Sequence, residues 1–419
     1  MTMTDLFIGL YPYVVCALLL YALIIALRRY FVGALNPERA HASKPSAPAL
    51  AVLRTILIAF VLSRALIWGI GYVGNAISGS LDTYLNNQLF IWTQWDAPHY
   101  LGIAENGYVT EGDARLHIVF YPLYPYLVRG LHALCPFLSI TAWAFLVSNA
   151  ALIGAAYVLF RLTEDTYGAK CARRAVWLFL LCPTGMFFSI PYTESVFLLC
   201  TLLSVRSARR QRFLLSVLFG ALASFSRLPG AVCAVPLYYE LIRAARRRGD
   251  SKARALLMSA LKCLPILSGF AAYVLINAIV TGNPFQFLIY QREHWGQSAG
   301  SVFRTARYTA YSLIYPNVDW YRWGVWLPQT VFLLLSAVML ALSARRLNAP
   351  DLAYALVYEN VVISPTMLIS GPRYLCAMYP AYLILARVRR RWARMLVYAV
   401  LAVLYVYCCW MFTVNRILL

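Results

Sequence analysis

The sequence predicts an all-α polytopic membrane protein, a bundle of about 11 to 13 transmembrane helices. Of its 419 residues, 62% are hydrophobic and only 13% are charged, and the mean hydropathy is +0.65. Soluble domains keep roughly a quarter of their residues charged. The apolar runs are long enough to cross ~30 Å of hydrocarbon as helices of ~20 residues. They lack the alternation of polar and apolar residues that marks barrel strands.

The net charge of +21 is distributed over short loops. Most Lys and Arg residues lie in clusters that flank apolar runs, at 28–54, 161–174, 206–212, 243–254, 345–346 and 387–394. Such clusters are typical of cytoplasmic loops, and they contact anionic lipid headgroups. No cluster is interleaved with aromatic residues as a stacking surface for bases would be. We therefore expect membrane lipids, and no nucleic acid, as partners.

The ten cysteines are scattered, mostly through apolar runs, without the spacing of zinc ligands or of a disulfide framework. The chain also lacks a GxGxxG motif, a P-loop and an internal repeat of the transporter kind. We expect no metal site and no cofactor.

The first part of the chain alternates between apolar spans and polar loops. Residues 6–27 form a retained span, 28–54 a proline-containing cytoplasmic linker, and 55–77 a second span. The following loop, 78–117, contains five acids and one cation, Arg115. This charge imbalance places the loop on the extracytoplasmic side.

The remaining spans are predicted from apolar runs, and their number depends on residues 121–205. We favour 121–137 as an interfacial or re-entrant helix, because this keeps the larger basic clusters on one side. The alternative is a single broken span over 175–205. The predicted later spans are 141–160, 175–190, 192–205, 213–227, 228–242, 255–280, 323–343, 351–369, 374–388 and 395–415. A second external loop, rich in aromatic residues, covers 281–323.

The first external loop contains the leading candidate for chemistry, Asp96. A carboxylate beside Trp95 can be partly desolvated, which favours proton acceptance. The alternative is a helix cap, because Asp-x-Pro commonly opens a helix. His99 and Tyr100 follow within one helical turn, so all three side chains could reach one substrate.

Four further groups of residues lie at breaks or in loops. Glu194 follows a segment broken by Pro183, Gly185 and Pro191, and either faces a polar pocket or caps the next helix. Arg227 and Arg373 are predicted at external span ends, where each binds a phosphate or pairs with a headgroup or a carboxylate such as Glu194. His294 and Trp295 lie in an aromatic segment that suits either sugar binding or an interfacial helix.

Several motifs together resemble the PIG-V mannosyltransferase family, over about residues 60 to 380. They are Trp95-Asp96-x-x-His99-Tyr100, Phe120-Tyr121-Pro122-Leu123-Tyr124-Pro125, Pro183 through Phe187-Phe188-Ser189 to Tyr192-x-Glu194, Ser226-Arg227-x-x-Gly230, Asn283-Pro284 through Trp295, and Arg373-Tyr374. Each motif is weak alone, but their order on a polytopic chain is specific.

The resemblance implies a GT-C glycosyltransferase with a catalytic first external loop. Asp96 matches the catalytic acid of that loop, which implies that it is the base in transfer of mannose from a polyprenyl-phosphate donor, with inversion. Arg227 and Arg373 are then expected to bind the donor phosphate. The residues expected to bind sugar or acceptor are Trp95, His99, Tyr100, Glu194, His294, Trp295 and Tyr374. Residues 1–50 precede the family pattern, so the glycosyltransferase domain is expected at 51–419.

The acceptor is expected to be a lipid-linked or envelope glycan, and an accessory membrane subunit is left open. Short loops and Arg-rich linkers are typical of a bacterial plasma-membrane protein with its active site facing outward. Two alternatives belong to other classes: a lipid or sugar transporter or flippase, and a non-catalytic lipid-binding subunit. A transporter predicts charges spread through mid-span positions and inverted repeats.

Overall fold

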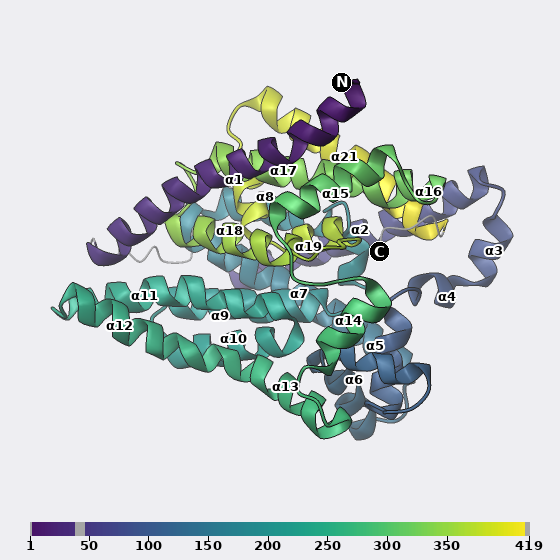
Figure 1. The fold of residues 1–419 in the computed structure, drawn as a ribbon, viewed down its shortest axis with the longest axis horizontal. Coiled ribbons are helices and arrows are strands. Elements are labelled where there is room, and N and C mark those ends of the chain that lie inside the picture. The colour runs from purple at the N-terminus through teal and green to yellow at the C-terminus, as the bar shows by residue number, and fades with distance from the viewer. Residues whose placement is uncertain (1, 38–46, 415–419) are drawn as a thin grey trace.

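Every regular element in the described part of the chain is a helix. The computed structural model describes residues 2–37 and 47–414, and its helices pack into one elongated bundle (Figure 1). The all-α prediction is confirmed. Residues 38–46 of the predicted cytoplasmic linker lie outside the described residues.

Six helical segments among the described residues are long and apolar enough to cross a membrane. They are α1 (Met3–Leu35), α2 (Ala49–Ile77), α7 (Ile140–Tyr167), α12 to α13 (Lys252–Thr281, with η4 at Leu264–Leu267), α16 to α17 (Asp319–Ser343, with η5 at Arg322–Trp326) and α21 (Arg391–Thr413). This is fewer than the predicted 11 to 13 spans. The difference lies in the other predicted spans, which are built from shorter helices.

The shorter helices that replace the other predicted spans are in most cases interrupted where the sequence places proline or glycine. They are α8 (Ala169–Leu180), η2 (Gly185–Phe188), α9 (Glu194–Arg209), α10 (Phe213–Ser226), η3 (Leu228–Cys233), α11 (Ala234–Arg247), α18 (Ala349–Ile363), α19 (Gly371–Cys376) and α20 (Pro380–Ala386). Proline removes a backbone donor and glycine weakens a helix, so these segments end where continuous spans would continue. Of the charged residues discussed below, Arg227 lies in the break between α10 and η3, and Glu194 and Arg373 lie in the helices that follow the breaks at 181–193 and 364–370.

The two predicted external loops fold into short helices. The first contains α3 (Leu81–Asn86), α4 (Gln88–Trp92), α5 (Ala97–Asn106) and η1 (Asp113–Val119), and the second contains α14 (Gln286–Trp295) and α15 (Val302–Ile314). Between them in sequence, α6 (Leu123–Leu134) has 12 residues, about 18 Å of helix. A helix of this length is too short to cross a membrane. An interfacial or re-entrant helix, as predicted for 121–137, does not need to cross it.

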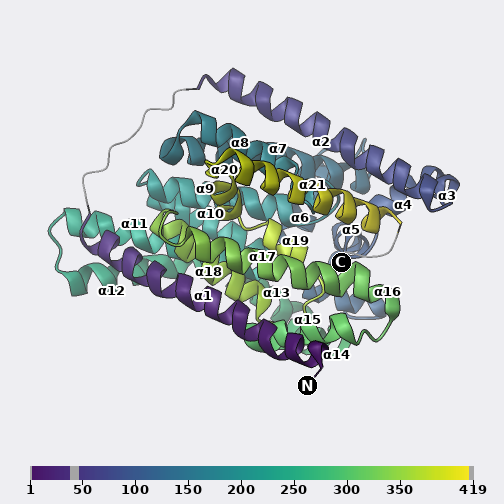
Figure 2. The same cartoon turned by 90° about the horizontal axis from the view of Figure 1, so that it is seen from above.

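The bundle has two distinct ends. The C-terminal end of α1, the N-terminal end of α2 and the α11–α12 turn lie at the left in Figure 2, whereas α3, α4, α14 and α16 lie at the right. Helices α1 and α2 lie on opposite sides of the bundle: α1 packs on α11, α15, α17 and α18, and α2 on α7, α8 and α21. The division of the chain into residues 1–50 and 51–419 stays a prediction.

One ion pair near the basic clusters joins two helices: Arg209 on α9 pairs with the buried Asp351 on α18. A second pair lies within α7, where Arg161 Nη1 is 2.8 Å from Glu164 Oε2. Tyr379 also donates a hydrogen bond to Asp351, at 2.6 Å. The Asp351 carboxylate therefore links α9, α18 and Tyr379, which precedes α20.

Candidate functional site

Asp96 occupies the N-cap position directly before α5, but its side chain makes no capping hydrogen bond. Its Oδ2 instead accepts a hydrogen bond from Arg373 Nη1 at 2.6 Å. The preceding residue, Trp95, has φ +62°, a left-handed conformation that costs a bulky residue roughly 1–3 kcal/mol. The backbone is therefore held in an unfavourable conformation that turns the Asp96 carboxylate toward the bundle interior. The capping alternative for Asp96 is wrong.

Glu194 lies between two arginines at the start of α9. Its Oε1 accepts hydrogen bonds from Arg373 Nε and from Arg227 Nη1. The side chain of Glu194 is 0% exposed, against 3% for Arg373, 15% for Arg227 and 29% for Asp96. Four charges thus form one row, Asp96–Arg373–Glu194–Arg227, with its most accessible end at Asp96. Glu194 is the first residue of α9, and the N-cap position belongs to Thr193.

Aromatic rings cover both guanidinium groups of this row. Arg373 lies 4.6 Å from the ring centre of Tyr192, and Arg227 lies 4.6 Å from that of Tyr374. The Tyr192 hydroxyl donates to Gln94 O at 2.9 Å and accepts from Asp96 N at 3.2 Å. Cation–π contacts are stronger where water is excluded, so these rings help to hold two buried cations. Tyr192 also fixes the backbone that carries Asp96.

His99 and Tyr100 lie on α5 within an aromatic cluster. His99 stacks on Phe120, with ring centres 4.6 Å apart, and meets His117 edge-on at 5.1 Å. Burial lowers the pKa of His99, and the nearby Asp96 carboxylate partly opposes this. Burial also lowers the pKa of His117. Tyr100 is buried and packs edge-on against Phe120 at 5.2 Å. The two imidazoles are therefore favoured in their neutral forms beside the carboxylate.

The two candidates from the second external loop are placed differently. Trp295, at the end of α14, packs edge-on against Phe120 at 6.1 Å and so joins the aromatic cluster. His294 is exposed and contacts Tyr290 and Trp295. Within the described residues it has no recorded contact with Asp96, Glu194 or either arginine, so the structure does not bring His294 into the charged row.

Two buried polar atoms beside the row lack partners within the described chain, Trp95 Nε1 and Glu194 Oε2. Buried polar groups are normally hydrogen-bonded, so these atoms are available to a polar ligand such as a sugar. The described residues contain no group of three or more His, Cys, Asp or Glu side chains that could hold a metal ion. The row can thus accept a proton at Asp96 and stabilise negative charge at its arginines.

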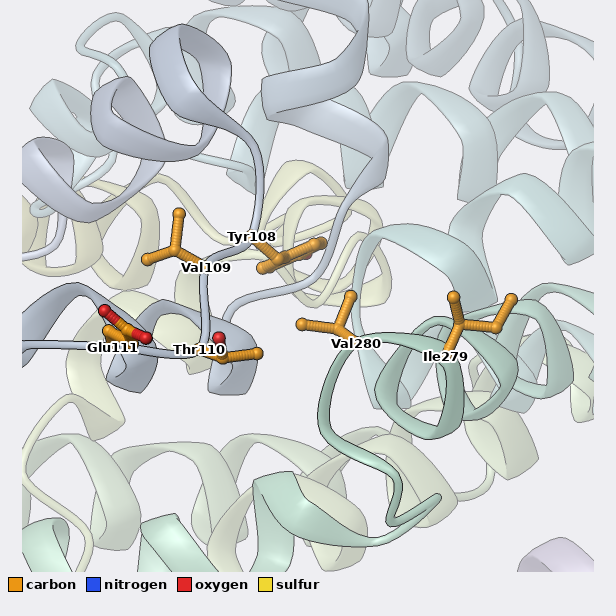
Figure 3. A pocket seen from close by; sticks show the side chains of 6 residues that line it. All are labelled: Tyr108, Val109, Thr110, Glu111, Ile279 and Val280. Carbon is orange, nitrogen blue, oxygen red and sulfur yellow. The ribbon is translucent and has the colours of Figure 1, made fainter.

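A surface cavity of about 680 Å³ lies beside this end of the bundle. It is lined by Tyr108, Val109, Thr110, Glu111, Ile279 and Val280, where the chain after α5 faces the end of α13 (Figure 3). It contains none of the predicted site residues. Tyr108 links it to the aromatic cluster, because its hydroxyl donates to Phe120 O at 2.6 Å.

Sequence reasoning missed Tyr192, His117 and Phe187 as site residues. Phe187 lies 5.4 Å from the Arg373 guanidinium, and Tyr192 bridges the backbone on either side of Trp95. Both belong to the proline- and glycine-broken segment before Glu194, whose irregular backbone was a usable signal. Nothing around His117 in the sequence indicates that it meets His99.

Comparison with known proteins identifies the family. The family described as Mannosyltransferase (PIG-V) matches residues 17–343, more than half of the chain. That range contains Asp96, Glu194 and Arg227, and it ends before Arg373.

Individual relatives match over shorter stretches. GPI alpha-1,6-mannosyltransferase 2 of Rattus norvegicus is 32% identical over 166 residues, and that of Homo sapiens is 30% identical over the same length. Each match covers 38% of this chain and 33% of the relative, so it spans about a third of the relatives' length. Among solved structures, the Archaeoglobus fulgidus oligosaccharyltransferase aligns with a TM-score of 0.43 at 12% identity, over 87% of this chain and 56% of that one. On the match to residues 17–343, this chain belongs to the mannosyltransferase (PIG-V) family.

Proposed function

We propose that this chain is an inverting glycosyltransferase that moves mannose from a polyprenyl-phosphate donor to an acceptor hydroxyl on the extracytoplasmic side of the membrane. The observation that carries the proposal is the pairing of Asp96 with Arg373 in a row of alternating charges. The PIG-V match supports the sugar. Lipid-linked or envelope glycans are the acceptor class, and a bacterial plasma membrane is the proposed location.

Asp96 acts as the base through the carboxylate oxygen that is not bonded to Arg373. Among described residues, Oδ1 makes no recorded hydrogen bond, whereas Oδ2 is held by Arg373. The acceptor oxygen attacks the anomeric carbon while its proton passes to Asp96. The bond from that carbon to the phosphate oxygen breaks, and its electron pair stays with the polyprenyl phosphate. Attack from the face opposite the phosphate inverts the anomeric centre.

The charges of the row change in the direction that this reaction needs. Two carboxylates and two guanidiniums balance before transfer. When Asp96 takes the proton, the row gains one net positive charge, and the leaving phosphate gains one negative charge. Arg373 loses one of its two carboxylate partners at that moment and keeps Glu194, so its Nη1 side can stabilise the phosphate, as buried donors do for developing charge. The arginines therefore need not be unpaired in the resting protein.

The test is transfer of labelled mannose from polyprenyl-phosphate mannose by the purified full-length protein. Asp96→Asn is expected to lower the rate by ~10²–10⁴-fold, the usual contribution of a positioned base. Asp113→Asn is the matched control, because Asp113 is an exposed acid of the same predicted loop. Folded Asp96→Asn protein with full turnover would show that the base is misassigned. If the wild-type protein consumes no donor, the transporter alternative is favoured.

A further inference from the structure

A further cation, the partly buried Arg64, lies in the middle of α2 (Ala49–Ile77), outside the charged row. Its Nε donates to Ser63 Oγ at 3.3 Å and its Nη1 to Gly185 O at 3.4 Å. Its Nη2 is buried and has no hydrogen-bond partner. No Asp or Glu within residues 2–37 and 47–414 forms an ion pair with it. The charge is satisfied only by neutral groups and by the ring of Phe60, 5.6 Å away.

An unpaired guanidinium at this depth is costly, because hydrocarbon and protein interior solvate it poorly. Arg227 and Arg373 avoid that cost by pairing with Glu194 and Asp96. The described chain offers Arg64 no such carboxylate. An anion from outside the chain would supply the missing charge.

Arg64 lines a cavity of about 590 Å³ between α2, α4, α7 and the turn at 186–190. A second polar group on its wall, Ser189 Oγ, is also buried without a partner. Two unsatisfied donors thus line one cavity, which suits the several oxygens of a phosphate. The rest of the wall is mainly apolar, with side chains that include Phe60, Ile67, Trp68, Leu89, Trp92 and Phe145.

We propose that this cavity binds a phosphate-bearing lipid, with the phosphate at Arg64 and Ser189 and the hydrocarbon tail along the apolar wall. Leu89, on that wall, is 62% exposed, so the cavity is reached from outside the bundle. The turn at 186–190 separates this site from the charged row, since Phe187 contacts Arg373 while Met186 and Ser189 line the cavity. The proposal does not depend on the mannose transfer proposed above.

The experiment counts lipids bound to the purified full-length protein by native mass spectrometry and measures the accompanying change in Tm. Wild type, Arg64→Leu and Arg54→Leu are delipidated and then titrated with a polyprenyl phosphate, with phosphatidylglycerol or with inorganic phosphate. Arg54 is the matched control, an exposed arginine on the same helix. Both substitutions leave the residues of the charged row unchanged, so a difference in count between the proteins reports on the Arg64 site.

Wild type and Arg54→Leu are expected to hold one more lipid than Arg64→Leu, and to gain a Tm increase that Arg64→Leu lacks. Loss of a charge-assisted contact corresponds to roughly 10- to 100-fold weaker binding at this site. The titrant that shows this additional bound molecule, polyprenyl phosphate or phosphatidylglycerol, identifies which lipid carries the bound phosphate. If Arg64→Leu does not fold, Leu89→Glu places an acid at the exposed wall and is expected to abolish the same binding. Equal lipid counts in wild type and Arg64→Leu, or an equal Tm increase from inorganic phosphate alone, would overturn the proposal.

Discussion

Two arginines share one carboxylate oxygen, Oε1 of Glu194, and Arg373 pairs with Asp96 as well. Arg373 and Arg227 both donate to Glu194 Oε1, and all three side chains are buried or nearly so. Removing one partner of a buried ion pair usually costs 3–5 kcal/mol, because the remaining charge stays buried without compensation. At this position two like charges would remain, at the centre of the proposed active site.

Glu194→Gln is therefore expected to lower the free energy of unfolding by about 3–5 kcal/mol. Thermal unfolding of the detergent-solubilised protein measures this as a lower Tm. Glu105→Gln is the control, since Glu105 is exposed and lies on α5 near the same end of the molecule. An unchanged Tm for Glu194→Gln would show that the arginines find other partners.

The two imidazoles beside Asp96 give a second residue-scale prediction, of pH dependence. Burial lowers the pKa of His99 and of His117 below the ordinary value of 6.5. Below about pH 6.5 the unfolded chain therefore binds more protons than the folded chain, so stability falls as the pH decreases. The loss grows from pH 6.5 down to the lowered pKa values and is then complete.

His99→Gln is expected to reduce the decrease in Tm between pH 7.5 and pH 5.5. His132→Gln serves as the control, because His132 lies on α6 with its Nδ1 2.9 Å from Leu138 O, outside the aromatic cluster. Both His99 and His117 contribute to the decrease in Tm over this pH range. The double variant His99→Gln/His117→Gln should therefore reduce that decrease further. If His99→Gln and wild type lose the same Tm on acidification, His99 does not contribute to the effect.

At the scale of elements, the packing of η3 on α10 positions Arg227. A Cβ atom on Gly230 would lie 2.0 Å from the Ala223 carbonyl carbon and 2.2 Å from Ser224 N. No real Cβ approaches backbone atoms this closely, so any side chain would push the two helices apart. Gly230 N also donates to Arg227 O at 2.9 Å. Displacing η3 would therefore displace Arg227 from Glu194.

Gly230→Ala is expected to destabilise the protein by at least ~1–3 kcal/mol, the usual range for overpacking, and to lower transferase activity. Gly130→Ala is the matched control, because nothing lies within 4 Å of a Cβ built there. Tm and mannose transfer are measured for both variants. Wild-type values for Gly230→Ala would mean that η3 can shift without disturbing Arg227.

At the scale of the whole molecule, the proposed orientation places the two ends of the bundle on opposite sides of the membrane. Phe90 on α4 and Lys170 on α8 are exposed, and they belong to the predicted external and cytoplasmic sides respectively. In a background without the partly exposed Cys16, Cys135 and Cys171, single cysteines at positions 90 and 170 report the side directly.

An impermeant maleimide added to intact cells is expected to label Phe90→Cys, and to label Lys170→Cys only after permeabilisation. Labelling of both positions from outside would contradict the prediction that residues 121–137 form an interfacial or re-entrant helix that does not cross the membrane. Labelling of Lys170→Cys alone would reverse the orientation of the whole bundle. The background protein without Cys16, Cys135 and Cys171, and with no added cysteine, gives the baseline.

The sequence by itself determined the membrane class, the helical bundle, the helix breaks around 181–193 and the family. These depend on composition, on the length of apolar runs, and on proline and glycine, which act locally. Only the tertiary structure decided which charges meet. Asp96 and Arg373 are 277 residues apart, and Glu194 and Arg373 are 179 apart, so their pairing follows from helix packing. The same packing brings a carboxylate beside Arg227 and beside Arg373. It brings none among the described residues beside Arg64, because the partner of a charge depends on distance in space and not on distance along the chain.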